Sequence, residues 1–157
     1  MIMIDRSLVG KCGLYCGACG VYRADKDDGE FLKKLAENFK CPPEKVKCNG
    51  CGALTETCWG NDCQIVQCLK ARGLEFCYEC DSYRGDSCEK FGRLAQRYMK
   101  IGVDVRQNLE RIKKGETEAW LRESEQRFKC PACAKPVPVY GTEGKCHRCG
   151  AALPQKL

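Results

Sequence analysis

Two C-x2-C pairs near the end of the chain constrain this sequence more than any other feature. They are Cys130/Cys133 and Cys146/Cys149, with twelve residues between the pairs. Two thiolates separated by two residues can bind one metal ion, and two such pairs complete the tetrahedral sulfur shell that zinc prefers. Four protein ligands close the shell, so the pattern predicts a structural zinc, with a rubredoxin-type iron as the alternative.

The residues between the two pairs favour a small β structure. Pro136-Val-Pro-Val-Tyr140 and the turn at Gly141–Gly144 predict a short hairpin, and residues 127–153 resemble a zinc ribbon. So short a segment cannot bury enough apolar surface to fold alone, so we expect its fold to depend on metal. His147, the single histidine, lies inside the second pair. With four thiolates available, we interpret it as a residue that does not bind the metal.

Cysteine is unusually frequent in the whole chain. There are 16 cysteines in 157 residues, a density typical of disulfide scaffolds or of proteins with several metal ions. The apolar run at Met1–Ile4 is too short for a signal peptide, and no apolar run approaches the ~20 residues of a membrane span. We therefore expect a cytoplasmic protein without a membrane partner, in which the thiols stay reduced and bind metal.

Twelve further cysteines lie within residues 12–88, enough for three more four-thiolate sites. Cys12, Cys16 and Cys19 form a local group that needs a fourth ligand from elsewhere or from a substrate. Cys41, beside Pro42, is the least favoured ligand. Two further pairs, Cys48/Cys51 and Cys77/Cys80, are expected to share one zinc. The remaining ligands would come from Cys58, Cys63, Cys68 and Cys88.

The first group also permits a different cofactor. C-x3-C-x2-C is the pattern that holds a [4Fe–4S] cluster in radical-SAM enzymes, but Ala18 stands where those enzymes have an aromatic residue. A chain of 157 residues with few strands is also too small for their β/α barrel. A simpler iron–sulfur redox protein, or an enzyme that uses this group, remains the alternative. With one histidine and no H-E-x-x-H or P-loop motif, enzyme activity is less favoured than a binding role.

Apolar periodicity predicts that the rest of the chain is helical. One stripe runs from Phe31 to Phe39, with Asp28 as the expected N-cap, and another follows Asp62 as far as Gly73. Residues 89–129 contain no cysteine and are predicted to be a helical spacer that packs back on the cysteine-rich module. The apolar positions of this spacer are Phe91, Leu94, Ala95, Tyr98, Met99, Val105, Leu109, Ile112, Trp120, Leu121 and Phe128.

The cysteine motifs, taken together, resemble a known family. Cys12-Gly-Leu-Tyr-Cys-Gly-Ala-Cys19, Cys48-Asn-Gly-Cys51, Cys63-Gln-Ile-Val-Gln-Cys68 and Cys77-Tyr-Glu-Cys80 are similar to those of an uncharacterised family of small cysteine-rich bacterial and archaeal proteins. The resemblance covers residues 8–95 and implies that the nine cysteines of these motifs form a shared set that excludes Cys41. Many members lack the C-terminal pairs, which implies two modules here, residues 1–129 and 130–157. The family brings no established activity.

These observations predict a mainly α-helical, small cysteine-rich domain held together by metal, with a helical bundle, plus a C-terminal β zinc ribbon. The predicted function is that of a zinc-binding interaction or adaptor module with several zinc ions and a protein or nucleic-acid partner. Residues 89–157 carry 15 Lys and Arg against 8 Asp and Glu, so a nucleic-acid binder that uses the ribbon and the basic helices is another alternative. The formal charge of +6 counts every thiol as neutral, however, and metal-bound thiolates would make the protein slightly negative.

Overall fold

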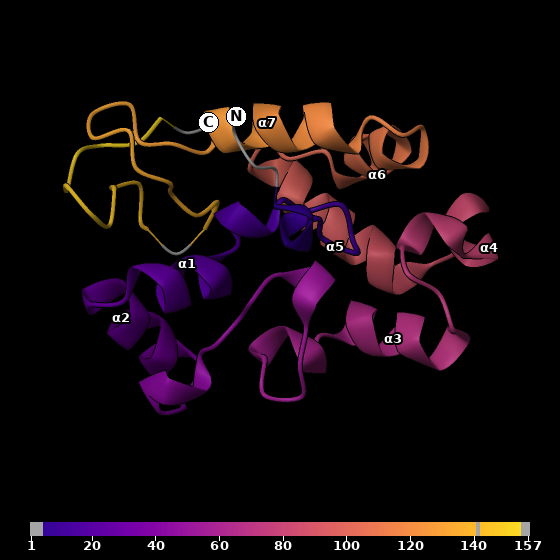
Figure 1. Ribbon diagram of the computed structural model, residues 1–157, viewed down its shortest axis with the longest axis horizontal. Helices are drawn as coiled ribbons and strands as arrows, with labels where there is room; N and C mark the ends of the chain where they lie inside the picture. Colours follow the sequence, from indigo (N-terminus) through magenta and orange to yellow (C-terminus); the bar gives the residue numbers. More distant parts are fainter. Residues whose placement is uncertain (1–4, 141, 155–157) are drawn as a thin grey trace.

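The computed structural model describes residues 5–140 and 142–154, and this part of the chain is mainly helical (Figure 1). The predicted helical class is therefore confirmed. Short 3₁₀ helices and turns connect the α-helices. No helix within the described residues is long and apolar enough to cross a membrane. The α-helices are α1 (Gly20–Asp27), α2 (Glu30–Asn38), α3 (Gln64–Arg72), α4 (Asp81–Arg84), α5 (Glu89–Lys100), α6 (Val105–Lys113) and α7 (Thr117–Arg127).

Helices α1 and α2 form a small core of their own, in which Phe31, Leu35 and Ala36 are buried as the apolar stripe predicted. The N-cap of α2 differs from the prediction. Asp28 has a φ of 53° and ends α1, while its carboxylate accepts the N–H of Gly29, which is the N-cap of α2. Asp62 was likewise expected to cap α3, but the N-cap is the next residue, Cys63.

The main core joins the last three helices to the first cysteine segment. Phe91 of α5, Leu109 of α6 and Trp120 of α7 are almost completely buried and belong to one cluster with Tyr15 and Ala18. In Figure 1, α7 and α6 lie above α5, which passes behind the N-terminal segment. Residues 89–129 thus supply the apolar surface that the loop-rich cysteine segment lacks.

One glycine explains how a helix can approach the first cysteine. Gly13 has a φ of 91°, and a Cβ at this position would lie 2.4 Å from the carbonyl oxygen of Val105. The side chain of Asn108 donates to the Gly13 carbonyl oxygen over 2.9 Å. Because only glycine accepts both the conformation and the contact, the residue after Cys12 allows α6 to pack directly on this loop.

The predicted β ribbon is not found. The described residues of the C-terminal segment contain no strand and only two isolated bridges, Lys129 with Pro136 and Lys145 with Ala152. Proline cannot donate to a β ladder, and the N–H of Val139 donates instead to the carbonyl oxygen of Ala18 over 2.9 Å. The segment expected to form a hairpin therefore pairs with the N-terminal part of the chain. Gly141, in the expected turn, lies outside the described residues.

Candidate metal centre

The two C-terminal C-x2-C turns have the same main-chain structure. In the first, the N–H of Ala134 donates to the carbonyl oxygen of Cys130 over 2.8 Å; in the second, Gly150 donates to Cys146 over 2.9 Å. Both donor residues have a positive φ, 60° and 77°. Each first cysteine also donates its own N–H five residues forward, over 2.9 and 2.8 Å. The chain therefore forms the same tight hairpin twice, once at each cysteine pair. These two cysteine hairpins are distinct from the β hairpin that the sequence predicted between the pairs.

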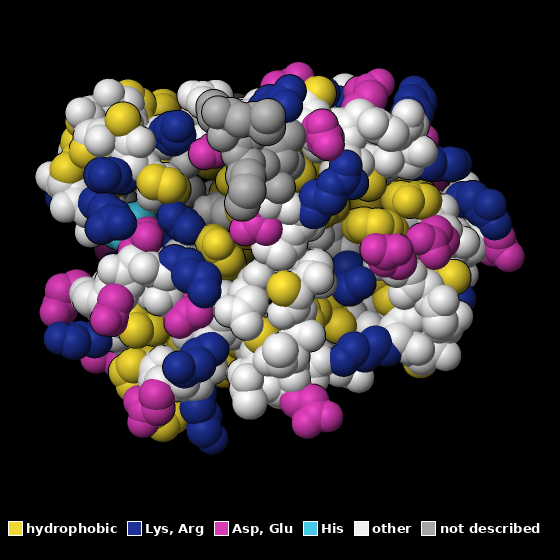
Figure 2. All heavy atoms as spheres, viewed as in Figure 1, with side chains coloured by type: hydrophobic (Ala, Val, Ile, Leu, Met, Phe, Trp, Pro, Cys, Tyr) yellow, Lys and Arg dark blue, Asp and Glu magenta, His cyan; other side chains and the backbone are white. Residues whose placement is uncertain are grey.

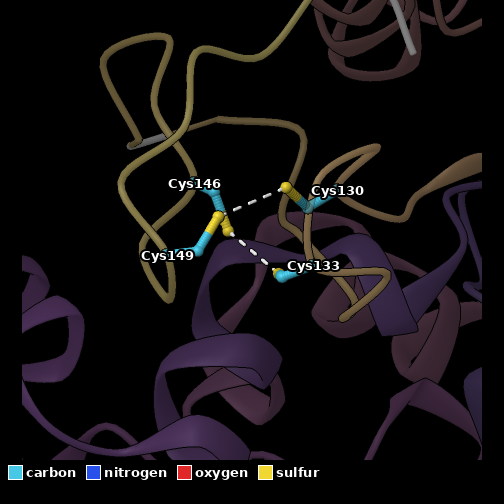
Figure 3. Close-up of side chains that lie close together, drawn as sticks. All are labelled: Cys130, Cys133, Cys146 and Cys149. Carbon is cyan, nitrogen blue, oxygen red and sulfur yellow. Dashed lines mark hydrogen bonds between the residues drawn. The ribbon is translucent and has the colours of Figure 1, made fainter.

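The four sulfur atoms of these hairpins point toward one another from two facing loops (Figure 3). All four lie within 4.8 Å of one another. The Sγ atoms of Cys130 and Cys149 are 3.6 Å apart, and those of Cys133 and Cys146 are 3.8 Å apart. A Zn–S bond of about 2.3 Å implies an S–S edge of about 3.8 Å in a tetrahedral shell. The thiols are thus already spaced to hold one metal ion.

Main-chain donors stabilise negative charge on this group. The N–H groups of Cys133 and Ala132 lower the pKa of Cys130 to about 7, with further help from the neighbouring thiols. The N–H of Arg148 donates to the Cys146 sulfur over 3.4 Å. The N–H of Ala151 also favours the Cys149 thiolate, but burial and the adjacent thiols raise the pKa of Cys149 to about 11. A metal ion would displace the protons that these thiols share.

Two residues of the second cysteine hairpin, His147 and Arg148, attach the four-cysteine site to α1. The Nε2 atom of His147 lies 2.8 Å from a carboxylate oxygen of Asp27, and both side chains are buried. The Arg148 guanidinium lies 3.3 Å from the other oxygen of the same carboxylate, and the His147 ring packs on Phe31 with centroids 5.0 Å apart. His147 thus lies outside the four-sulfur group and is used for docking. The sequence carried no signal that singled out Asp27 among the acidic residues of its segment.

Replacing Asp27 with alanine is expected to destabilise the protein without removing any ligand of the four-cysteine site. The substitution removes the partner of two buried side chains, His147 and Arg23, which should cost about 1–3 kcal/mol of unfolding free energy. Urea unfolding measures this loss of unfolding free energy. Glu37→Ala, at an exposed position of α2, is the matched control. If the two variants had equal stability, the docking role of Asp27 would be refuted.

The C-terminal segment also covers the first cysteine group. The hydroxyl of Tyr140 and the thiol of Cys19 share a hydrogen bond of 3.6 Å, and the tyrosine ring lies directly against the backbone of Gly20. In Figure 1 the loops of residues 130–154 lie above α1 and α2. Residues far apart in the sequence therefore form one continuous structure around Cys19.

Cys51 joins the three cysteines of the first group. Its N–H donates to the Cys16 sulfur over 3.4 Å. A hydrogen bond with the Cys16 thiol lowers the pKa of Cys51 to about 7, while this bond and burial raise the pKa of Cys16. Burial raises the pKa of Cys12 and of Cys19, and Cys51 is among the charges that raise both further. The structure thus places the thiol of Cys51 beside the first cysteine group, which has only three thiols of its own.

The other cysteines are grouped differently from the sequence prediction. A small cavity is lined by Cys77 and Cys80 together with Cys68 and Cys88, so this pair does not face Cys48/Cys51. The remaining thiols are less organised: Cys48 packs in the small core with Cys41, Cys58 is buried, and Cys63 is exposed at the N-cap of α3. In the described part of the chain, the C-terminal four are the one group of cysteines, histidines or carboxylates whose ligand atoms meet within 4.8 Å.

A family model described as "Protein of unknown function (DUF3795)" matches residues 8–93. The chain belongs to this family. The DUF3795 match includes all twelve cysteines of residues 12–88 and ends before the C-terminal four. Searches of curated proteins and of solved structures found no match.

Proposed function

We propose that this protein binds zinc at Cys130, Cys133, Cys146 and Cys149, and that this zinc is structural. The observation that carries the proposal is the close approach of the four sulfur atoms, all within 4.8 Å of one another. Four thiolates leave zinc no open position for a substrate. The zinc would hold two short hairpins in the orientation in which they dock on α1.

Such a zinc supports an interaction or adaptor role better than catalysis. His147, the one histidine and the natural candidate for an acid or base, is engaged with Asp27 and buried. All sixteen cysteines are free thiols and are therefore available as metal ligands. We propose a partner protein as the ligand of this module.

Nucleic-acid binding has weaker support. On the face seen in Figure 2, Lys and Arg side chains are interspersed with Asp and Glu side chains across the whole surface, so this face offers no continuous basic patch. Metal-bound thiolates would reduce the positive charge of the protein further. If the protein does bind nucleic acid through charge, its affinity must fall steeply as salt is added.

An iron–sulfur cluster in the first cysteine group is the second candidate. The observation in its favour is the position of Cys51, which brings a fourth thiol to the group of Cys12, Cys16 and Cys19. Four thiolates suit both zinc and a [4Fe–4S] cluster. Tyr140 covers Cys19 from one side, and limited access of solvent is one of the factors that tune the potential of such clusters.

Metal analysis of the full chain purified without air separates these candidates. We expect a colourless protein with at least one zinc per chain, and the variant Cys130→Ser/Cys149→Ser should lose one zinc. The control is Cys41→Ser, which changes a thiol outside the proposed sites. Brown protein with iron and inorganic sulfide would support the iron–sulfur candidate, and unchanged zinc in the double variant would refute the C-terminal site.

A further inference from the structure

A second group of four cysteines surrounds a cavity between α3 and α5. Cys68 lies in the middle of α3, and Cys88 is the N-cap of α5. Cys77 is the first residue of the 3₁₀ helix Cys77–Glu79, and Cys80 is its C-cap. All four line the same cavity, which has a volume of about 20 Å³. Figure 1 shows α3 below α5, with α4 beside them. Four thiols from three separate elements thus converge on one small space.

The size of this cavity suits one ion. A buried water molecule needs about 10–15 Å³ of such space, so the cavity holds one particle of about that size. The lining includes Ile65, Leu69 and Phe91, which would keep bulk water away from the ion.

The surroundings supply positive charge to the sulfurs. The guanidinium of Arg72 donates to the Cys80 sulfur over 3.4 Å, and Lys90 also lines the cavity. A zinc ion with four thiolates carries two net negative charges, and these two cations would balance them. The N–H groups of residues 82 and 83 also bond to the Cys80 sulfur, and the N–H of Phe91 donates to the Cys88 sulfur over 3.5 Å. Donors of this kind stabilise thiolate ligands from outside the metal shell.

Metal binding at this cavity has to displace a proton from the buried thiol of Cys77. Burial, followed by the neighbouring Cys88, Cys68 and Cys80, raises the pKa of Cys77 to about 12. The Arg72 guanidinium contacts one of the four sulfurs, and Lys90 contributes to the wall of the cavity. A metal ion gives the thiols, the cavity and the cations a common explanation.

We propose that Cys68, Cys77, Cys80 and Cys88 form a second zinc site, separate from the C-terminal one. This inference goes beyond the proposed function, which rests on the C-terminal four alone. The sulfurs here lie farther apart than those of the C-terminal group. Rotation of one cysteine between χ1 rotamers moves its sulfur by about 3 Å, and zinc binding here requires such rotation to close the shell. Four thiols bind one zinc ion and release their protons to solvent.

Zinc content of matched variants tests the site. The full chain is purified with zinc under reducing conditions, as wild type and as Cys77→Ser/Cys88→Ser, Cys130→Ser/Cys149→Ser, the combination of both, and Cys41→Ser. We expect each double variant to lose one zinc per chain, the combination to lose two, and Cys41→Ser to lose none. Wild-type zinc content in Cys77→Ser/Cys88→Ser would overturn the proposal. Failure of the C-terminal site would appear separately, as unchanged zinc in Cys130→Ser/Cys149→Ser.

A second measurement uses the wild-type protein, because a variant that lacks the buried thiol of Cys77 can fail to fold. Cys68, Cys88 and Cys41 are all partly exposed, so as free thiols they should react with an alkylating reagent at similar rates. In the zinc-loaded protein we expect Cys68 and Cys88 to react at least ten times more slowly than Cys41, as read by peptide mass spectrometry. Similar rates for all three would refute zinc binding in this cavity.

Discussion

If the C-terminal site holds zinc as proposed, its removal is expected to unfold the two cysteine hairpins, from Cys130 onward, and to leave the helical core folded. The small core of this segment consists of Val137 and two of the ligands, Cys130 and Cys146. Burial of Val137 contributes about 1.5–3 kcal/mol, and each docking hydrogen bond, such as that of His147, adds about 0.5–1.5 kcal/mol. Ordering the segment costs about 1–2 kcal/mol per residue, which exceeds this sum. Zinc bound to a site of this kind contributes about 10–16 kcal/mol at neutral pH.

Hydrogen exchange measures this effect directly. The amides of Ala134 and Gly150 close the two hairpins, so their protection should fall at least a hundredfold when a chelator removes the zinc or when Cys130 and Cys149 are replaced. The amides of α6 should keep their protection. Cys41→Ser with zinc is the control. Full protection of both hairpin amides in the metal-free protein would show that docking alone holds the segment.

Leu109→Ala is expected to lower the free energy of unfolding by about 2–5 kcal/mol. Leu109 is fully buried, with 0% of its surface exposed, and packs against the glycine that follows Cys12. The substitution would leave a cavity where α6 meets the first cysteine segment. Urea unfolding at a fixed zinc concentration checks the value, because bound metal also shifts the apparent stability.

Met99→Ala is the matched control for this prediction. Met99, on α5, is 52% exposed, so its truncation should change the unfolding free energy by less than about 0.5 kcal/mol. If Leu109→Ala lowered the free energy of unfolding no more than Met99→Ala does, α6 and the cysteine segment would not share a core.

The helices could be predicted from the sequence because their signal is local. The stripes of Phe31 and Leu35, and of Leu109 and Ile112, repeat at helical spacing, and all four side chains are buried. Helix ends were less predictable. Asp28 has the residue type of an N-cap, but a left-handed conformation at this position ends the preceding helix instead, and sequence periodicity carries no information about that conformation.

The grouping of the cysteines could not be predicted because it depends on tertiary structure. A C-x2-C pair shows that two sulfurs lie close together, but not which distant thiols complete their shell. The sequence suggested that Cys48/Cys51 and Cys77/Cys80 share one ion, whereas the structure places Cys51 beside Cys16 and places the second pair in a cavity with Cys68. The C-terminal group was predictable because both of its pairs lie in one short segment.

The docking contacts of the C-terminal segment also have a consequence for the order of folding. The bonds from His147 to Asp27 and from Tyr140 to Cys19 join residues that are 120 and 121 positions apart. Contacts of such high sequence separation form late, because closing a long loop costs chain entropy before any contact compensates for it. Before these contacts form, the carboxylate of Asp27 is exposed to water. If the C-terminal site binds zinc as proposed, attachment of its hairpins is expected to be a late step of folding whose rate depends on the supply of the metal.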